Sequence, residues 1–274
     1  MSTPRVSVVL PVRDGAAHVA AAVESILGQT LADLELLVVD DGSTDATPAV
    51  LAGVRDARCR VLTVAAAGTA AALNHGIAHA RGPLIARMDA DDVALPERLA
   101  RQLAVLERHA DVGVLGTGWR EQGPGGDVVE VAPPPADDAA IRRVLPRRNP
   151  MAHPTVVMRR AAGDAVGWYD ARLPVVQDYD LWLRLASRTR FANLPEPLLI
   201  RTFSTAMTSL ARDDLRLATE VRVKWAALRR GDLPATAAVH LLRPVLVRLL
   251  PHAVRRARRR RRAGGLGLTA RHRA

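Results

Sequence analysis

Three aspartates end an apolar run near the middle of the chain, and their spacing suits divalent-metal chemistry. The run 84–88 is followed directly by Asp89-Ala90-Asp91-Asp92. Because unpartnered buried carboxylates are unfavourable, acids gathered at a strand end are expected to face water, a cation or a polar ligand. Asp89 and Asp91 stand where a strand gives way to a turn, so their oxygens can converge on a hard divalent cation, which prefers oxygen ligands. Alternatively, Asp92 caps a helix that starts near Pro96.

Two further acidic clusters follow apolar runs in the same way. Asp14 follows the run 6–12, and the run 34–39 ends in Asp40-Asp41-Gly42-Ser43-Thr44-Asp45. Unbroken apolar runs of this length predict strands covered on both faces, and helical spacing of the apolar residues between them predicts β-α units. In a parallel sheet of such units, ligands bind outside the carboxyl ends of the strands. All three clusters are therefore predicted at one binding edge.

The pattern that positions this edge is regular as far as residue 115 and then changes. We predict strands at 6–12, 34–39, 60–64, 84–88 and 112–115, alternating with helices. Gly123-Pro124-Gly125-Gly126 and Pro133-Pro134-Pro135 are breakers, so 119–136 is predicted irregular or a hairpin. Short strands are expected at 156–158 and 195–200, and a helix is expected to carry Asp178 and Asp180 at its start. From Asp213 the spacing predicts a helix that buries Leu217, Val221, Trp225 and Leu228.

The net charge of +11 lies almost wholly in the C-terminal tail. Residues 251–274 contain nine arginines and no acid, so the other 250 residues carry only +2. The single cysteine excludes an internal disulfide framework and fits a reducing compartment. No stretch approaches a membrane span, and an apolar run that starts at Val6 leaves no room for a signal peptide. We therefore expect a cytoplasmic protein, peripheral on the inner face of the plasma membrane if the tail binds lipid.

Four motifs in order resemble the family 2 inverting glycosyltransferases of GT-A fold. They are Val6–Pro11, Val38-Val39-Asp40-Asp41-Gly42-Ser43-Thr44-Asp45, Asp89-Ala90-Asp91-Asp92 and Asp178-Tyr179-Asp180-Leu181-Trp182-Leu183-Arg184, within residues 5–203. The resemblance implies an α/β, GT-A-like, mostly parallel sheet flanked by helices. It also implies a metal-dependent enzyme of hexosyltransferase type that moves a sugar from a nucleotide-sugar, a UDP-sugar, to a glycan or lipid-linked acceptor in cell-envelope polysaccharide synthesis. We then expect a nucleotide-sugar-binding half at 1–118, an acceptor-binding half at 119–210 and an amphipathic helical extension with an arginine-rich tail at 211–274.

The resemblance assigns the donor side to the first acidic clusters. Its substrate-binding positions are Pro11, Val12, Asp14 and Asp41 for the base and ribose, Asn74 near the nucleotide-sugar, and Asp89 for the ribose. The implied metal ligands are Asp91, directly on Mg²⁺ or Mn²⁺, and Asp89. Asp41 accepts the uracil N–H, closes an Asx-turn through Gly42, or does both. Arg87 either adds positive charge near the pyrophosphate or is an exposed, solvated side chain. Asp40, Ser43, Thr44 and Asp45 are expected to shape the loop and cap the next helix.

The acceptor side follows from the last motif. Asp178 is implied as the general base, because inversion by single displacement needs a carboxylate opposite the leaving group. His153 matches a family segment near the acceptor and is either substrate-binding or structural, and Trp182 is either an acceptor-stacking platform or part of the core. The chain departs from the family pattern at three positions, where relatives have Glu, Arg and His: Gln177, Leu73 and Phe203.

Other classes of protein fit the sequence less well. The absence of G-x-G-x-x-G, G-x-x-x-x-G-K and D-x-D-x-T motifs argues against a Rossmann dehydrogenase, a P-loop kinase and a haloacid-dehalogenase phosphatase. A sugar nucleotidyltransferase shares much of the architecture but opens with a Gly-rich basic loop that is missing here. Nucleic-acid binding through the tail is disfavoured, because 251–274 has no aromatic residue for base stacking. An anionic membrane surface contacted through 235–262 is the partner we expect for the tail.

Overall fold

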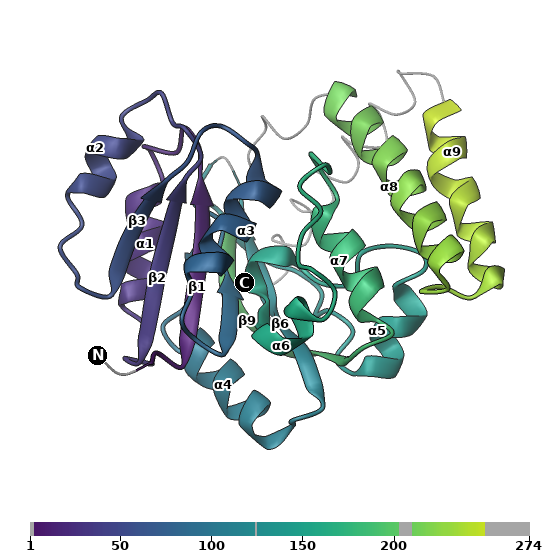
Figure 1. The fold of residues 1–274 in the computed structure, drawn as a ribbon, viewed down its shortest axis with the longest axis horizontal. Helices are drawn as coiled ribbons and strands as arrows, with labels where there is room; N and C mark the ends of the chain where they lie inside the picture. Colours follow the sequence, from purple (N-terminus) through teal and green to yellow (C-terminus); the bar gives the residue numbers. More distant parts are fainter. Residues whose placement is uncertain (1–2, 124, 203–209, 250–274) are drawn as a thin grey trace, which may run out of the picture.

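Nine strands form one sheet in the computed structural model, which describes residues 3–123, 125–202 and 210–249. The strand order is β3-β2-β1-β4-β8-β6-β9-β5, with β7 added to β6. The strands are β1 Val6–Val12, β2 Leu34–Asp40, β3 Cys59–Thr63, β4 Leu84–Arg87, β5 Val93–Ala94, β6 Val112–Gln122, β7 Val128–Glu130, β8 Val157–Arg159 and β9 Arg190–Thr202. Helices lie on both faces of this sheet (Figure 1). The predicted α/β fold with a mostly parallel sheet is confirmed.

Strands β3, β2, β1 and β4 run parallel, and their register brings the acidic clusters to one edge. Val12 of β1 pairs with Asp40 of β2, and Val9 pairs with Arg87 of β4. The helices of this part are α1 Val19–Leu27, α2 Thr47–Ala52, α3 Thr69–His79 and α4 Arg98–Arg108. All seven residues of β1 and of β2 are buried, which is why their sequences are unbroken apolar runs.

The two faces of the sheet bury separate apolar clusters. Val8 and Leu10 of β1 join α1 and α4 in one cluster, whereas Val9 joins α3 and α7 (Gln177–Leu185) in the other. Helix α3 lies very close to the sheet: a Cβ on Gly76 would be 2.5 Å from Val9 Cγ1. This close packing fixes where α3 begins relative to the carboxyl ends of the strands.

The second half of the sheet is mixed. Strand β6 pairs in parallel with β9 and antiparallel with β7 and β8, and the β6–β7 pair confirms a hairpin within 119–136. The strands predicted at 156–158 and 195–200 correspond to β8 and to part of the longer β9. The short helices are α5 Asp138–Val144, η1 His153–Thr155 and α6 Arg160–Asp164. Because β6 runs across residue 118, the two proposed halves share a strand, and their boundary stays a prediction.

The C-terminal extension consists of α8 Leu210–Arg230, η3 Ala235–Leu241 and α9 Leu242–Leu249, which lie together at one end of the molecule (Figure 1). The predicted buried face of α8 is wrong at Trp225, whose side chain is exposed. Leu217 is buried as predicted, but Lys224 and Ala227 are buried in place of Trp225, because α8 turns this side toward α7. In the described residues no helix is long and apolar enough to cross a membrane.

Candidate active site

Strand β4 delivers Asp89, Asp91 and Asp92 to the sheet edge. One carboxylate oxygen of each lies within 4.8 Å of the others. The chain is held here because Met88 donates its N–H to the carbonyl of Val9 at 3.2 Å. The loop after β1 reaches the same point, since a Cβ on Gly15 would lie 4.0 Å from the Cβ of Ala90. The carboxylate cluster therefore lies beside the end of β1.

The negative charge of this carboxylate cluster is only partly compensated by positive charges and hydrogen-bond donors of the described residues. Burial and the charge of Asp89 raise the pKa of Asp91. Burial and the charges of Asp89 and Asp91 raise the pKa of Asp92 to about 7. Among the described residues, the buried Asp92 Oδ2 has no hydrogen-bond partner. A divalent cation would supply the missing positive charge, and these oxygen donors are the kind that Mg²⁺ and Mn²⁺ bind. The residues present therefore fit such an ion.

The helix-start interpretation of Asp92 is wrong. The residues that follow it form β5, which pairs with β9, and α4 begins only at Arg98. Asp92 Oδ1 instead accepts the N–H of Thr202 at 3.0 Å. Its carboxylate thus joins the segment after β4 to the end of β9. The sequence around Asp92 does not predict this long-range contact.

Arg87 supplies the central positive charge of the site. Its side chain is buried and forms an ion pair with Asp89, so the interpretation as an exposed, solvated arginine is wrong. Burial opposes its charge, but Asp89 prevails and the pKa of Arg87 is raised. Its Nε and Nη1 have no hydrogen-bond partner in the part of the chain that the structure describes. Buried N–H groups of a cation are rarely left unpaired, and an anionic ligand would pair them.

A second buried cation, Arg98, stabilises the main chain of the site. Its Nη2 donates to the carbonyl of Arg87 at 2.8 Å, and its Nη1 lies 3.3 Å from Met88 Sδ. Burial lowers the pKa of Arg98 to about 9, against the charge of Asp92, which raises it. Sequence reasoning missed Arg98, because an arginine at the start of an amphipathic helix is usually solvent-exposed.

The end of β1 is joined to the loop after β2. Pro11 and Val12 are buried at the end of the strand, and the carbonyl of Val12 accepts the N–H of Asp41 at 2.8 Å. Asp14 Oδ1 accepts the N–H of Thr44 at 2.7 Å, and this bond lowers the pKa of Asp14. The exposed carboxylate of Asp14 thus joins the loop after β1 to the loop after β2.

Asp41 connects β2 to the start of α3. Its two carboxylate oxygens accept the N–H groups of Ala67 and Gly68 at 2.7 and 2.9 Å. The Asx-turn interpretation of Asp41 is wrong, because Asp40 closes the loop by accepting the N–H of Ser43 at 2.9 Å. The buried Asp41 keeps its remaining lone pairs free at this edge of the sheet.

Asp178 lies in the first turn of α7, as the sequence predicted. Its Oδ2 accepts Nδ2–H of Asn149 at 2.6 Å, and its Oδ1 accepts the N–H of Tyr179 at 2.8 Å. Burial raises the pKa of Asp178, and the charge of Arg87 acts to lower it. The same guanidinium acts to lower the pKa of Asp91, although burial keeps that pKa raised. Arg87 is therefore within electrostatic reach of both Asp178 and the carboxylate cluster.

Tyr169 links α3 to η1 and was missed by sequence reasoning. The Asn74 amide donates to the carbonyl of Tyr169 at 2.8 Å and accepts its N–H at 3.1 Å. The Tyr169 hydroxyl lies 2.7 Å from His153 Nε2. Burial lowers the pKa of His153 well below its usual value, which keeps the ring neutral at pH 7. Both Asn74 and His153 thus hold Tyr169, and their predicted contacts with substrate stay predictions.

Trp182 belongs to the core. Its side chain is fully buried and meets the His153 ring edge-on, with ring centroids 6.0 Å apart. Its Nε1–H lacks a partner among the residues described here. The acceptor-stacking interpretation of Trp182 is wrong, because neither face of the indole is open to a sugar.

Comparison of the sequence with known protein families identifies the family of this chain. The sequence profile described as glycosyl transferase family 2 matches residues 7–167. The chain belongs to this family. Among relatives of this glycosyltransferase, EpsE of Bacillus subtilis (strain 168) is 32% identical over 265 residues, which cover 92% of each chain. The O-antigen biosynthesis glycosyltransferase WbnJ of Escherichia coli is 31% identical over 222 residues, covering 75% of this chain and 84% of WbnJ.

Solved structures share the fold of the glycosyltransferase. Residues 1–349 of TarS from S. aureus, in complex with UDP-GlcNAc, match 88% of this chain and 71% of that one with a TM-score of 0.69 at 18% identity. The mannosyltransferase PcManGT from Pyrobaculum calidifontis, in complex with GDP-Man and Mn²⁺, matches 89% of this chain and 69% of its own with a TM-score of 0.63 at 20% identity.

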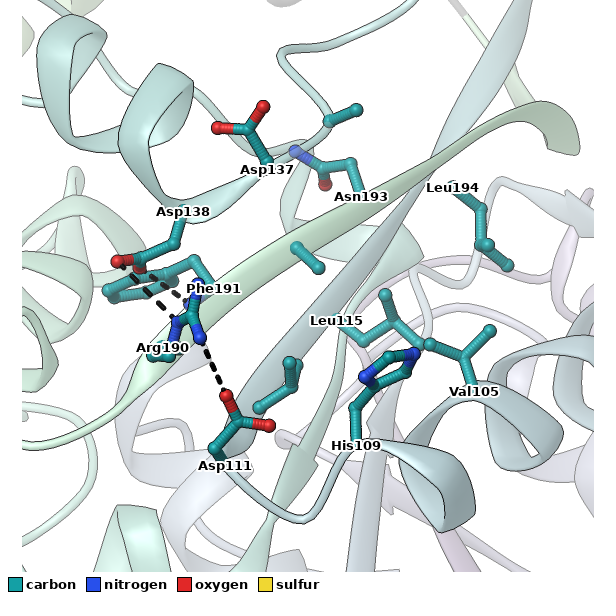
Figure 2. Close-up of a pocket in the computed structure, with 13 residues that line it drawn as sticks. Val105, His109, Asp111, Leu115, Asp137, Asp138, Arg190, Phe191, Asn193 and Leu194 are labelled. Carbon is teal, nitrogen blue, oxygen red and sulfur yellow. Dashed lines mark hydrogen bonds and ion pairs between the residues drawn. The ribbon is translucent and has the colours of Figure 1, made fainter.

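A pocket of the glycosyltransferase lies away from all of these residues. Figure 2 shows it between the first residues of β6 and β9, the end of α4 and the start of α5. Arg190 lies at its rim in ion pairs with Asp111 at 2.8 Å and Asp138 at 4.0 Å. None of the predicted site residues lines this pocket. Phe203, one of the departures from the family pattern, lies outside the described residues.

Proposed function

We propose that this glycosyltransferase is a metal-dependent, inverting enzyme that moves a sugar from a UDP-sugar to a hydroxyl of a polymeric or lipid-linked glycan. The observation that carries the proposal is that one buried cation, Arg87, is within electrostatic reach of both a carboxylate cluster and a separate single carboxylate. These two acidic groups suit different chemical roles. The cluster of Asp89, Asp91 and Asp92 suits a metal and a diphosphate. Asp178, held on α7, suits proton abstraction.

The similar proteins support the substrate classes. TarS was solved with UDP-GlcNAc, PcManGT with GDP-Man and Mn²⁺, and WbnJ is named for O-antigen biosynthesis. In our proposal Asp41 accepts the N–H of the uracil ring, and the main chain at Pro11 and Val12 holds the nucleotide beside Asp14. Asp89 and Asp91 hold Mg²⁺ or Mn²⁺. The unpaired N–H groups of Arg87 donate to a diphosphate oxygen.

The proposed reaction is a single displacement. The acceptor hydroxyl oxygen forms a bond to the anomeric carbon while the bond from that carbon to the diphosphate oxygen breaks. The hydroxyl proton passes to Asp178, whose raised pKa makes it a better base than an exposed aspartate. Asn149 keeps the receiving oxygen oriented by donating to it. When bound, the metal supplies electrostatic stabilisation of the leaving diphosphate.

A donor screen tests this proposal. The protein is mixed with UDP- and GDP-sugars and Mn²⁺, and both transfer and slow hydrolysis are recorded, with the anomer of the released sugar assigned by NMR. Wild type should release product of inverted configuration from a UDP-sugar. Asp178→Asn should lower the rate about 10²-fold or more, because general-base catalysis is worth at least that much.

Asp111→Asn is the matched control for this screen. Asp111 is an exposed aspartate that pairs with Arg190 beside the distant pocket, so its amide variant should keep the wild-type rate. A retained anomeric configuration would exclude the single displacement. Full activity of Asp178→Asn would remove Asp178 as the base.

A further inference from the structure

The last described segment of the chain carries an exposed apolar stripe. Val239 of η3 and Leu242, Val245 and Leu246 of α9 are all exposed. Their spacing of three, three and one residues places them on one side of the continuous η3–α9 rod. These four residues are called the stripe. Nothing in the described part of the chain covers them.

Exposed large apolar side chains are concentrated in this extension. Six of the eight found in the described residues belong to α8, η3 and α9, and the remaining two, Val61 and Val128, lie on separate strands. Single exposed apolar residues are ordinary on protein surfaces, whereas a gathered set marks an interaction surface.

The part of the sequence that holds the stripe carries charge of one sign. Residues 221–274 contain fifteen lysines and arginines and one acid, Asp232, which is paired with Arg230 at 2.7 Å. The first 220 residues contain 24 basic and 27 acidic residues, so the rest of the molecule is slightly negative. The nine arginines of 251–274 follow directly after the stripe in sequence. An apolar stripe joined to a run of cations matches a surface that offers both acyl chains and anionic headgroups.

We propose that the stripe inserts into the interface of an anionic lipid bilayer while the arginines that follow it bind the headgroups. A second copy of the chain fits the stripe poorly, because a symmetric contact would bring two strongly positive tails together. Nucleic acid also fits poorly, since 226–274 contain no Phe, Tyr or Trp on which bases could stack.

The extension is firmly joined to the acceptor side, so docking it would orient the enzyme. Buried Lys224 of α8 donates to the carbonyl of Arg147 at 3.0 Å and to Glu220 at 2.8 Å. Its ammonium lies 5.7 Å from the ring centroid of Tyr179, the residue after Asp178. A membrane contact through α9 therefore holds α7 at a fixed place relative to the lipid surface.

Vesicle sedimentation of the full chain tests the proposal. The probes are phosphatidylcholine vesicles with and without about one quarter phosphatidylglycerol. Wild type should sediment with the anionic vesicles and only weakly with the neutral ones, and salt should weaken the binding. Val239→Ser with Val245→Ser should lower the partition coefficient on anionic vesicles about tenfold, because two exposed apolar side chains no longer enter the interface.

The chain offers a control matched in residue type. Val61 and Val128 are 43% and 44% exposed, compared with 56% and 41% for Val239 and Val245. Val61→Ser with Val128→Ser should sediment like wild type. Equal losses in the two double variants, or none in either, would overturn insertion of the stripe. Because all four side chains are exposed, circular dichroism should show both variants folded.

Two further readouts separate other occupants from lipid. A wild-type dimer in light scattering that becomes a monomer in Val239→Ser with Val245→Ser would assign the stripe to a second copy and overturn the proposal. Unchanged vesicle binding in that variant, lost only on replacing Arg258–Arg262 with Ser, would reduce the contact to charge alone and also overturn insertion. Sedimentation needs no sugar transfer, so its outcome is independent of the donor screen.

Discussion

Two aspartate-rich segments lie on one sheet edge, and the fold uses their carboxylates in opposite ways. In the segment 40–45 and its partner Asp14, each aspartate accepts main-chain N–H groups: Asp14 from Thr44, Asp40 from Ser43, Asp41 from Ala67 and Gly68, and Asp45 from Thr47 and Ala16. In the segment 89–92, Asp92 accepts one N–H and leaves its buried second oxygen unpaired within the described residues. The carboxylates of the first segment hold the loops in place, whereas those of the second keep oxygens and negative charge free to bind a ligand.

The pKa values follow the same division. Hydrogen bonds from Thr44 and Thr47 lower the pKa of Asp14 and of Asp45. Burial raises the pKa of Asp91 and of Asp92. The number of acids in a motif therefore says little about its chemistry, whereas a lack of donors to buried acids points to a ligand.

The largest effect should come from Asp91→Asn. We expect kcat/KM for sugar transfer to fall about 10²-fold or more with Mn²⁺ present, because a metal ligand is lost where the diphosphate charge develops. The unfolding free energy should not fall, since a buried, incompletely balanced charge disappears with the substitution. Initial rates and thermal unfolding measure the two quantities. A loss of stability as large as the loss of activity would contradict the division of the two segments.

The pH dependence of stability should differ between the segments. In EDTA, the folded pKa of Asp92, about 7, exceeds its unfolded value of about 3.9, so the folded state binds an extra proton between these values. Stability should therefore fall as the pH rises through this window. Asp92→Asn should remove this part of the slope and stabilise the metal-free protein at pH 8 by a few kcal/mol, because each pH unit between the folded and unfolded pKa values corresponds to about 1.4 kcal/mol.

Asp45 provides the opposite sign. Its pKa is lowered in the folded state, so its contribution to stability is present above its unfolded pKa and is lost as the pH falls further. Denaturant titrations across pH 4–8 in EDTA should give a flatter slope above pH 5 for Asp92→Asn and a wild-type slope there for Asp45→Asn. Equal slopes in all three proteins would remove Asp92 as the titrating group.

The sequence was sufficient to predict the strands that form the site, but it did not predict the buried arginines that compensate the charge of its carboxylates. Strands β1 and β2 are buried on both faces, so their unbroken apolar runs report both their existence and their ends. Arg87 is the one charged residue of the apolar strand β4, and Arg98 begins the amphipathic helix α4. Both side chains are buried, with Arg87 paired to Asp89 and Arg98 donating to the carbonyl of Arg87. Nothing in the sequence pattern around either arginine indicates that its side chain is buried.

Two tryptophans show the same limit. Trp182 and Trp225 both lie at helical spacing with neighbouring leucines, yet the first is fully buried and the second is 55% exposed. In α8, Leu217 belongs both to the predicted apolar face and to the face that holds Lys224 and packs on α7. Which face of α8 turns inward is decided by the fit of Lys224 against Arg147 and Tyr179, and helical periodicity does not contain that information.

A moderate effect is expected from Asp41→Asn. Asparagine offers one carboxamide oxygen and an NH₂ group to the two N–H donors of Ala67 and Gly68, so one donor is left unpaired. The unfolding free energy should fall by about 1–2 kcal/mol. The KM for the donor should rise severalfold while kcat changes little, because the proposed contact of Asp41 is with the base. A fall in kcat with unchanged KM would contradict that placement.

The smallest effect should come from Asp40→Asn, and it separates geometry from charge. Asp40 Oδ1 accepts one N–H, from Ser43, and an asparagine oxygen can accept the same bond. Stability should therefore change by no more than about 0.5 kcal/mol, and activity should stay at the wild-type level, whereas Asp40→Ala should lose about 1 kcal/mol with the acceptor. The first segment then needs an oxygen where the second needs a negative charge. An equally strong loss of sugar transfer in Asp40→Asn and Asp91→Asn would mean that the negative charge matters in both segments. That result would contradict the division between them.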